Sequence, residues 1–579
     1  MTLYAFGPFV VEPAEHRLTR DGRQVAVPRK AWQILLLLAE AGGRLVPYET
    51  FRERLWPNIV VEDRTLTVHV STLRKALAGG SDTNYIETVN GAGYRLAVPV
   101  RILSPAESSS PPARVEPRPV GVSTFSTANQ SDTDEHLGVG MADALTTALG
   151  GLPGLTVSPA GAVDDLSRAR TLGLDYLLEG AVQRSGGQLQ VSARLVDVGS
   201  GHTRRSEQFA HAQSDGVGLQ DAIARWVATS LPQAPRLDHG VRSYRPRAAE
   251  AYFLQLQARA HLKPFTRLPL LKALTLFEQA LVLDPDYAMA HAGLASTYLL
   301  MASTAMLRPL PVDEAMPMAR RLAERALALD ENLAEAWAAL GRVKMEHDGD
   351  WDGAEADLEH AVGLNPSSVE ALATFGEFLS AMGRHDEAIE AMERARRLDP
   401  RHVETLQHLG IAYWMAGDGD KALEAVSDSL KISPDSPRGH YGRMLILDQL
   451  GRHDEAMVER LATLRGLSVA QGLAEQVEAL ARSQGWKAAM TLWIALLERT
   501  NRWEGAAMQW MAAGESARAL DALEHCVRAR TTYLSFTGQS PCFRPLHGDP
   551  RFQQILRTIN LAGRVGSALP PHSYGEVAR

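Results

Sequence analysis

The sequence feature that most constrains this chain is a repeat of 34 residues in its C-terminal half. Pro366, Pro400 and Pro434 stand 34 residues apart, in the similar segments VGLNPSSVEALATFGEF, RRLDPRHVETLQHLGIAY and LKISPDSPRGHYGRMLI. Glu331 takes the proline position 35 residues before Pro366, and Pro285 precedes Glu331 by 46 residues, which indicates an insertion. The apolar residues within each repeat have helical spacing, so the period predicts stacked pairs of antiparallel helices.

This period is that of tetratricopeptide repeats (TPRs), and it predicts an all-α TPR solenoid over residues 248–563. One helix pair cannot cover its own apolar face, so neighbouring pairs must stack. Five glycines at equivalent positions are expected where two helices approach closely: Gly293, Gly341, Gly376, Gly410 and Gly442. The groove of such a solenoid is expected to bind an unknown protein or peptide, and the alternative is a structural spacer.

Composition shifts divide the rest of the chain into further domains. Residues 104–117 are rich in Pro and Ser, without apolar periodicity, which predicts a linker. Residues 118–235 combine alternating strand patterns with helical runs, which predicts a small α/β domain. Residues 564–579 are expected to form a flexible tail. With residues 1–103 as an N-terminal domain, the predicted fold class is multidomain α+β.

The net charge of −8 is unevenly distributed along the chain. Residues 1–103 hold 13 Lys and Arg against 10 Asp and Glu, a net charge of +3, which leaves −11 for the remainder. Attraction to phosphate is therefore expected at one end of the molecule. The apolar run Ile34 to Ala39 is too short to span a bilayer, and the N-terminus resembles no secretion leader, so no membrane contact and a cytoplasmic location are expected.

The N-terminal domain contains a helical pattern with two distinct faces. In VEDRTLTVHVSTLRKAL, the residues Leu66, Val70, Leu73 and Leu77 fall on one side of a helix and predict a buried stripe. The opposite side carries Arg64, Val68, Ser71, Thr72 and Lys75. These side chains suit a major groove, because base edges accept hydrogen bonds from hydroxyl, Arg and Lys groups and a thymine methyl can contact Val68.

A β-hairpin is predicted after this helix. The segments Tyr85 to Val89 and Tyr94 to Leu96 alternate around Asn90-Gly91-Ala92-Gly93, a tip that tolerates positive φ. Such a tip can lie beside the DNA backbone or in the minor groove.

Together, VEDRTLTVHVSTLRKAL and YIETVNGAGYRL resemble the recognition helix and wing of OmpR/PhoB-type winged helix-turn-helix regulators. The resemblance implies that the third helix enters the major groove of double-stranded DNA and that the wing contacts the minor groove or phosphates. The predicted DNA-binding residues are Arg64, Thr65, Thr67, Val68, Ser71, Thr72, Arg74, Lys75, Thr88, Asn90, Tyr94 and Arg95. Many family members carry Arg where this chain has Ser71, Thr72 and Asn90, so affinity is expected to depend on a homodimer on DNA.

Two further inferences rest on resemblance. The loop Pro57, Asn58, Ile59 and Val60 corresponds to the segment that touches RNA polymerase in that family. The stretch from RPVGVSTF to LVDVGSGHTR is similar to a TolB-amino-terminal-like domain, and the module order is similar to that of CadC- and HilA-type regulators, here without a transmembrane helix.

No nucleophile elbow, P-loop or zinc-binding helix is present in the sequence, and Cys526 and Cys542 lack partners at metal-ligand spacing. The chain is therefore predicted to be no enzyme, with no cofactor and no metal. The favoured hypothesis is a sequence-specific DNA-binding transcriptional regulator whose TPR region binds a protein or ligand signal. The alternative is a TPR interaction scaffold whose winged-helix module no longer reads DNA sequence.

Overall fold

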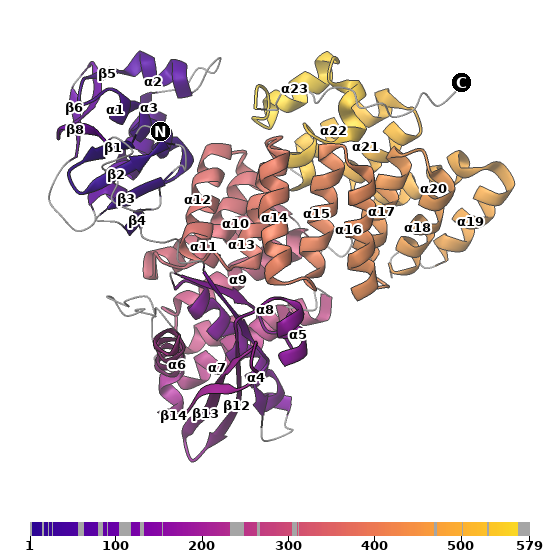
Figure 1. Ribbon diagram of the computed structural model, residues 1–579. Coiled ribbons are helices and arrows are strands. Elements are labelled where there is room, and N and C mark those ends of the chain that lie inside the picture. The colour runs from indigo at the N-terminus through magenta and orange to yellow at the C-terminus, as the bar shows by residue number, and fades with distance from the viewer. Residues whose placement is uncertain are drawn as a thin grey trace. The chain divides into compact units, whose positions relative to one another are not determined.

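The protein is described from a computed structural model (Figure 1). It describes residues 3–13, 17–20, 23–25, 27–55, 63–78, 85–89, 91–103, 117–127, 132–152, 154–231, 248–262, 267–303, 310, 312–467, 472–500, 502–529 and 532–564. The chain divides into two compact units, Met1–Glu116 and Pro117–Arg579.

Unit 1 begins with an antiparallel sheet. Its five strands, in the order β4-β3-β2-β1-β8, are β4 (Arg23–Val25), β3 (Arg17–Arg20), β2 (Phe9–Glu12), β1 (Leu3–Phe6) and β8 (Val100–Leu103). The last strand of the unit therefore returns to pair with the first, Leu3 opposite Leu103.

Three helices and a small second sheet complete unit 1. The helices are α1 (Arg29–Glu40), α2 (Tyr48–Leu55) and α3 (Asp63–Ala78), and the sheet has the order β5 (Val46–Pro47), β7 (Gly93–Leu96), β6 (Ile86–Val89). Apolar side chains from both sheets and all three helices share one core, in which Phe9, Leu35, Phe51 and Val70 are fully buried. This arrangement of helices and hairpin is that of a winged helix.

Unit 2 begins with an α/β domain around a mixed six-stranded sheet. Its main order is β11-β9-β12-β13-β14, and β10 pairs with β12. The elements of the domain are β9 (Arg118–Val122), β10 (Ser126–Thr127), α4 (Asp132–Gly150), β11 (Leu155–Ser158), α5 (Leu166–Thr171), β12 (Tyr176–Ser185), β13 (Gln188–Asp197), β14 (Thr203–Ala212) and α6 (Gly216–Ser230).

Antiparallel helix pairs follow the α/β domain. The pairs are α7 (Ala249–Leu262) with α8 (Arg267–Leu283), α9 (Ala288–Ser303) with α10 (Val312–Leu329), α11 (Ala334–Val343) with α12 (Trp351–Leu364), α13 (Val369–Ala381) with α14 (His385–Leu398), α15 (Val403–Ala416) with α16 (Gly419–Ile432), α17 (Pro437–Gln449) with α18 (His453–Arg465), α19 (Leu473–Gln484) with α20 (Trp486–Arg499) and α21 (Trp503–Ala512) with α22 (Ser516–Ala529). The stacked pairs form the predicted solenoid (Figure 1).

The repeat sequence explains where these helices start. Ser368 and Ser436 cap α13 and α17 by accepting a hydrogen bond from the backbone N–H three residues on, and Asp350 and Asp418 do the same for α12 and α16. Such caps satisfy N–H groups that the first helical turn leaves without partners.

The expectation that glycines permit close helix contacts holds at four of the five positions. A Cβ on Gly341, Gly376 or Gly410 would lie within 3.3 Å of a backbone oxygen of the partner helix, and one on Gly293 would lie 2.3 Å from the Phe277 ring. At Gly442 the expectation is wrong, because no heavy atom lies within 4 Å of the added Cβ.

The C-terminal part of the solenoid packs back onto its middle. After α22, two short 3-10 helices, Thr532–Phe536 and Pro541–Leu546, lead to α23 (Pro550–Thr558). Side chains of this segment share a core with α11 to α14, and the Arg564 guanidinium pairs with both Asp352 oxygens at 2.9 and 3.0 Å. No helix in the described ranges combines the length and apolar character that crossing a membrane requires.

The α/β domain and the first helix of the solenoid share a hydrophobic core. Tyr252, Phe253 and Leu256 of α7 are buried among residues of the domain, and Gln220 donates a 2.7 Å hydrogen bond to the Tyr252 hydroxyl. Close packing against Leu256 excludes a side chain at Gly140, where an added Cβ would meet the Leu256 Cβ at 2.7 Å. The two parts of unit 2 are therefore joined by packing as well as by the chain.

Candidate DNA-binding surface

Helix α3 has one buried and one exposed face. Leu66, Val70, Leu73 and Leu77 are at most 3% exposed, which confirms the predicted stripe. On the outer face, Thr67 and Ser71 are exposed and Thr72 is half-buried. The outer face thus presents small hydroxyl groups, which can donate to or accept from a base edge.

Several of the predicted DNA-binding residues lie wholly or partly outside the described structure. Arg64, Thr65, Val68 and Lys75 belong to α3, but their side chains are not among those described. Asn90 and the loop of Pro57, Asn58, Ile59 and Val60 lie outside the described residues altogether.

Arg74 joins α3 to the wing. Its Nε and Nη2 donate to the Ile86 carbonyl oxygen at 3.2 and 2.8 Å, and Nη2 also donates to Thr88 Oγ1 at 2.6 Å. The guanidinium carbon lies 5.9 Å from the centre of the Tyr94 ring. Because the planar guanidinium is engaged by strand β6 and an aromatic ring, Arg74 holds the wing against α3.

Tyr94 has a different place from the one expected of a DNA contact. Its side chain is 3% exposed and packs edge-on against Tyr48 and Phe51 of α2, with ring centres 5.4 and 6.0 Å away. The predicted role is corrected accordingly: alternation along β7 points Tyr94 into the core and its neighbour Arg95 outward.

The exposed face of the wing carries an ion pair. Arg95 Nε donates to Glu87 Oε2 at 2.7 Å across the antiparallel pair of β6 and β7, and both side chains are nearly half exposed. This hydrogen bond lowers the pKa of Glu87 and raises that of Arg95. A phosphate that approaches Arg95 must therefore compete with Glu87, a residue that sequence reasoning did not single out.

Backbone packing fixes the base of the wing. A Cβ on Gly93 would lie 2.0 Å from the Val46 carbonyl oxygen, because β7 pairs with β5 there and Gly93 lies opposite Pro47. Only glycine permits this approach, so Gly93 sets the position of the wing relative to α2.

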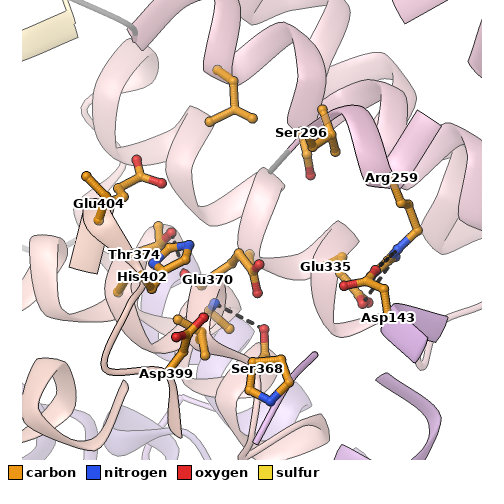
Figure 2. Close-up of a pocket in the computed structure, with 18 of the residues that line it drawn as sticks. Asp143, Arg259, Ser296, Glu335, Ser368, Glu370, Thr374, Asp399, His402 and Glu404 are labelled. Carbon is orange, nitrogen blue, oxygen red and sulfur yellow. Dashed lines mark hydrogen bonds and ion pairs between the residues drawn. The ribbon is translucent and has the colours of Figure 1, made fainter. Parts of the chain in front are cut away.

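A second candidate site lies in unit 2, in a cavity of about 700 Å³ between the α/β domain and the solenoid. Figure 2 shows Arg259 of α7 beside Asp143 of α4 and Glu335 of α11, with Glu370 between this group and Glu404. Asp143 and Arg259 are 116 residues apart in sequence, and Arg259 Nη2 also donates to Thr147 Oγ1 at 3.1 Å. Sequence reasoning missed these residues, because no local pattern connects them.

An ionic network lies at one side of this cavity. Glu377, Glu404 and His408 bring their ligand atoms within 4.8 Å of one another, the kind of cluster that can hold a metal ion. Here Arg438 contacts both His408 and Glu404, at 3.4 Å for the latter, and Arg342 Nη2 lies 3.6 Å from Glu377. Two guanidinium groups already neutralise the carboxylates, so the cluster is better suited to an internal salt bridge than to a cation.

Comparison with known proteins gives family matches in two regions of the chain. Residues 22–96 match the family "Transcriptional regulatory protein, C terminal", which is the OmpR/PhoB-type domain. Residues 347–409 and 379–445 match the family "Tetratricopeptide repeat". The helical-repeat and winged-helix predictions are thereby confirmed.

Three relatives illustrate the range of similar proteins. Transcriptional regulator HilA of Salmonella typhi is 25% identical over 399 residues, which cover 67% of this chain and 69% of HilA. Putative adenylate cyclase 3 of Rhizobium meliloti is 26% identical over 204 residues, 33% of this chain and 34% of that protein. Transcriptional activator CadC of Escherichia coli is 29% identical over 134 residues, 22% of this chain and 26% of CadC. HilA, CadC and the two PhoB proteins, of Rhizobium meliloti and Pseudomonas aeruginosa, are named as regulators or activators of transcription.

Proposed function

We propose that this chain, in which an OmpR/PhoB-type domain is joined to tetratricopeptide repeats, is a sequence-specific DNA-binding regulator of transcription. The observation that carries the proposal is the outer face of α3. Thr67 and Ser71 are exposed there, opposite a completely buried apolar stripe, and the wing is held beside them by Arg74. A helix that is firmly packed on one face and bears hydroxyls on the other can enter a major groove.

The DNA-binding face has two kinds of contact in this proposal. Contacts to phosphates come from Arg64, Lys75 and Arg95. Contacts to bases come from Thr67, Ser71 and Thr72. The division follows from chemistry, because cationic groups bind phosphates of any sequence whereas short hydroxyl side chains distinguish base edges. With few arginines on this face, a single domain binds weakly. Two copies on neighbouring half-sites would raise the affinity through linkage.

Unit 2 serves as the part that receives a signal. Its α/β domain has the strand and helix content expected from the resemblance to a TolB-amino-terminal-like domain, and its first helices border a cavity. The cavity is lined by both the α/β domain and the solenoid. A ligand bound in it can therefore alter how these two parts pack against each other. We assign the protein a cytoplasmic location, no catalytic role, and contact with RNA polymerase through Pro57 to Val60.

The test is selection of genomic DNA fragments by the full chain at two salt concentrations, followed by sequencing of the retained DNA. The proposal predicts a shared motif that remains enriched at the higher salt concentration. Retention without enrichment that disappears as salt rises would reject sequence-specific binding and favour an interaction scaffold.

A further inference from the structure

The cavity of unit 2 has the size of a small-molecule site. Its volume of about 700 Å³ lies within the range of roughly 300 to 1,000 Å³ that is usual for such sites. The wall on one side is the first helix of each pair from α7 to α17, and on the other it is α4 and the loop Pro159–Gly161 after β11. An apolar body fits these walls, since Met289, Leu299, Val369 and Val403 contribute to them.

Contacts on the rim hold the α/β domain against the solenoid. The Val157 backbone N–H donates to Ser367 Oγ at 3.0 Å, and Arg401 Nη1 lies 2.8 Å from Asp164 Oδ2. The first contact joins strand β11 to the turn before α13, and the second joins the loop after β11 to the turn before α15. The α/β domain therefore borders the groove in which a solenoid of this kind could take an extended peptide, and the space that remains suits a compact ligand.

The charged side chains that line the cavity indicate the sign of the charge that a ligand would carry. Seven carboxylate side chains and four guanidinium groups line the cavity. Each guanidinium already has a carboxylate partner: Arg259 with Asp143 and Glu335, Arg342 with Glu346 and Glu377, Arg401 with Asp164, and Arg438 with Glu404. An anionic ligand would have to break one of these pairs, whereas a cation would reduce the excess of negative charge.

Glu370 is the carboxylate best placed to receive a positive charge. It lies in the first turn of α13, its side chain is exposed to the cavity, and within the described ranges it forms no ion pair. In Figure 2 it lies between the Asp143–Arg259–Glu335 group and the Glu404–His402 side. The Thr374 hydroxyl donates a 2.9 Å hydrogen bond to the Glu370 backbone carbonyl oxygen. Thr374 therefore leaves the Glu370 carboxylate accessible.

We propose that this cavity binds a small organic cation, an ammonium group on an apolar frame, with Glu370 as the carboxylate that pairs with the ammonium. The inference rests on the proposed function and deepens it, because it names the class of signal that unit 2 receives. A ligand that contacts α4 and α13 at once would stabilise the packing of the α/β domain on the solenoid.

The experiment measures thermal unfolding of the full chain with sets of ammonium compounds, each with the alcohol and the carboxylate of the same carbon skeleton. One set is cyclohexylmethylammonium, cyclohexylmethanol and cyclohexanecarboxylate, and further sets carry larger apolar frames and quaternary ammonium groups. The expected result is a rise in Tm with ammonium members only, and titration calorimetry of the best compound then gives its affinity.

Glu370→Gln is expected to weaken that affinity roughly 10- to 100-fold, since the ammonium then meets a neutral amide in place of a carboxylate. The matched control is Glu390→Gln on α14, an exposed glutamate outside the cavity, which should leave affinity unchanged. Glu370→Asp should retain part of the binding, which separates loss of charge from loss of folding.

Three results would overturn the inference: stabilisation by the alcohols or carboxylates instead, stabilisation by none of the compounds, or unchanged ammonium binding in Glu370→Gln. Tighter binding of the peptide Ala-Lys-Ala than of any free amine would also reject a small-molecule site. Because no DNA is present, these outcomes are independent of fragment selection, so failure of the cation site and failure of DNA recognition remain distinguishable.

Discussion

Arg74 Nη2 donates a 2.6 Å hydrogen bond to Thr88 Oγ1, and this contact joins α3 to the first strand of the wing. The same nitrogen donates to the Ile86 carbonyl oxygen at 2.8 Å. A residue that the sequence places among the DNA contacts thus has its donors directed at the protein. In the proposed DNA complex, its role would be to fix the distance between α3 and the wing.

Replacing Arg74 by Ala should weaken binding to the selected DNA site by about 1 to 3 kcal/mol, because the wing loses its charged hydrogen bonds to α3. The slope of log affinity against log salt should change little, since no phosphate contact is removed. Binding titrations at several salt concentrations measure both quantities. Thr88→Val, which removes one acceptor, should show a smaller loss. A slope reduced by about one in Arg74→Ala would instead identify Arg74 as a phosphate contact.

Replacing Lys75 by Ala should, unlike the Arg74 substitution, change the salt dependence of DNA binding. Binding to specific and non-specific duplexes should fall by a similar factor, and the salt slope should decrease by about one, because a single phosphate contact is lost. Competition binding with the selected site and a scrambled duplex measures the two affinities. A loss confined to the selected site would contradict the assignment of Lys75 to the DNA backbone.

Tyr94→Ala should destabilise unit 1 by about 3 kcal/mol, since it removes a buried ring from between Tyr48 and Phe51. Tyr94→Phe keeps that ring and should bind DNA with unchanged affinity. Urea denaturation of the full chain followed by DNA titration checks both variants. Weaker DNA binding in a fully folded Tyr94→Phe protein would show that the Tyr94 hydroxyl contacts DNA after all.

Periodicity predicted the part of the site that depends on one element alone. The buried stripe Leu66 to Leu77 follows from a helical repeat of 3.6 residues, and the repeat of 34 residues predicted the helix pairs in the same manner. Tyr94 was misplaced because a strand has two faces, and which of them is buried depends on α2, a distant segment. Gly442 shows the same limit, since an equivalent repeat position does not ensure equivalent packing.

The cavity could not be predicted for a related reason. Asp143 lies on α4 within the α/β domain, and Arg259 lies on α7 after it, so their pairing exists only once α7 packs on that domain. Likewise, Val157 and Ser367 are 210 residues apart. Contacts between such segments depend on the packing of whole domains, which local spacing does not encode.

Glu377 should make the stability of the solenoid dependent on acid pH. Burial alone would raise the pKa of Glu377, but His408 and Arg342 outweigh burial and hold it at about 2, below the ordinary value of 4.5. A carboxyl with a lowered folded-state pKa stabilises the protein above pH 4.5, and this contribution is lost as the pH falls toward 2.

The corresponding variant is Glu377→Gln. It should lower the free energy of unfolding by about 3 kcal/mol at pH 7, and the difference from the unsubstituted protein should shrink between pH 4.5 and pH 2. Denaturation series across this pH range provide the measurement, with Glu390→Gln as the exposed control. A difference that is constant with pH would show that the ion pairs of Glu377 are not its source.

The most direct test of sequence-specific recognition by α3 is the affinity of the full chain, and of Thr72→Ala, for every single-base variant of the selected site. If the outer face of α3 meets base edges, the substitution should change preference by about 1 to 3 kcal/mol at one or two adjacent base pairs and leave the others unchanged. An equal loss at all positions, or no change at any, would contradict base readout by this helix.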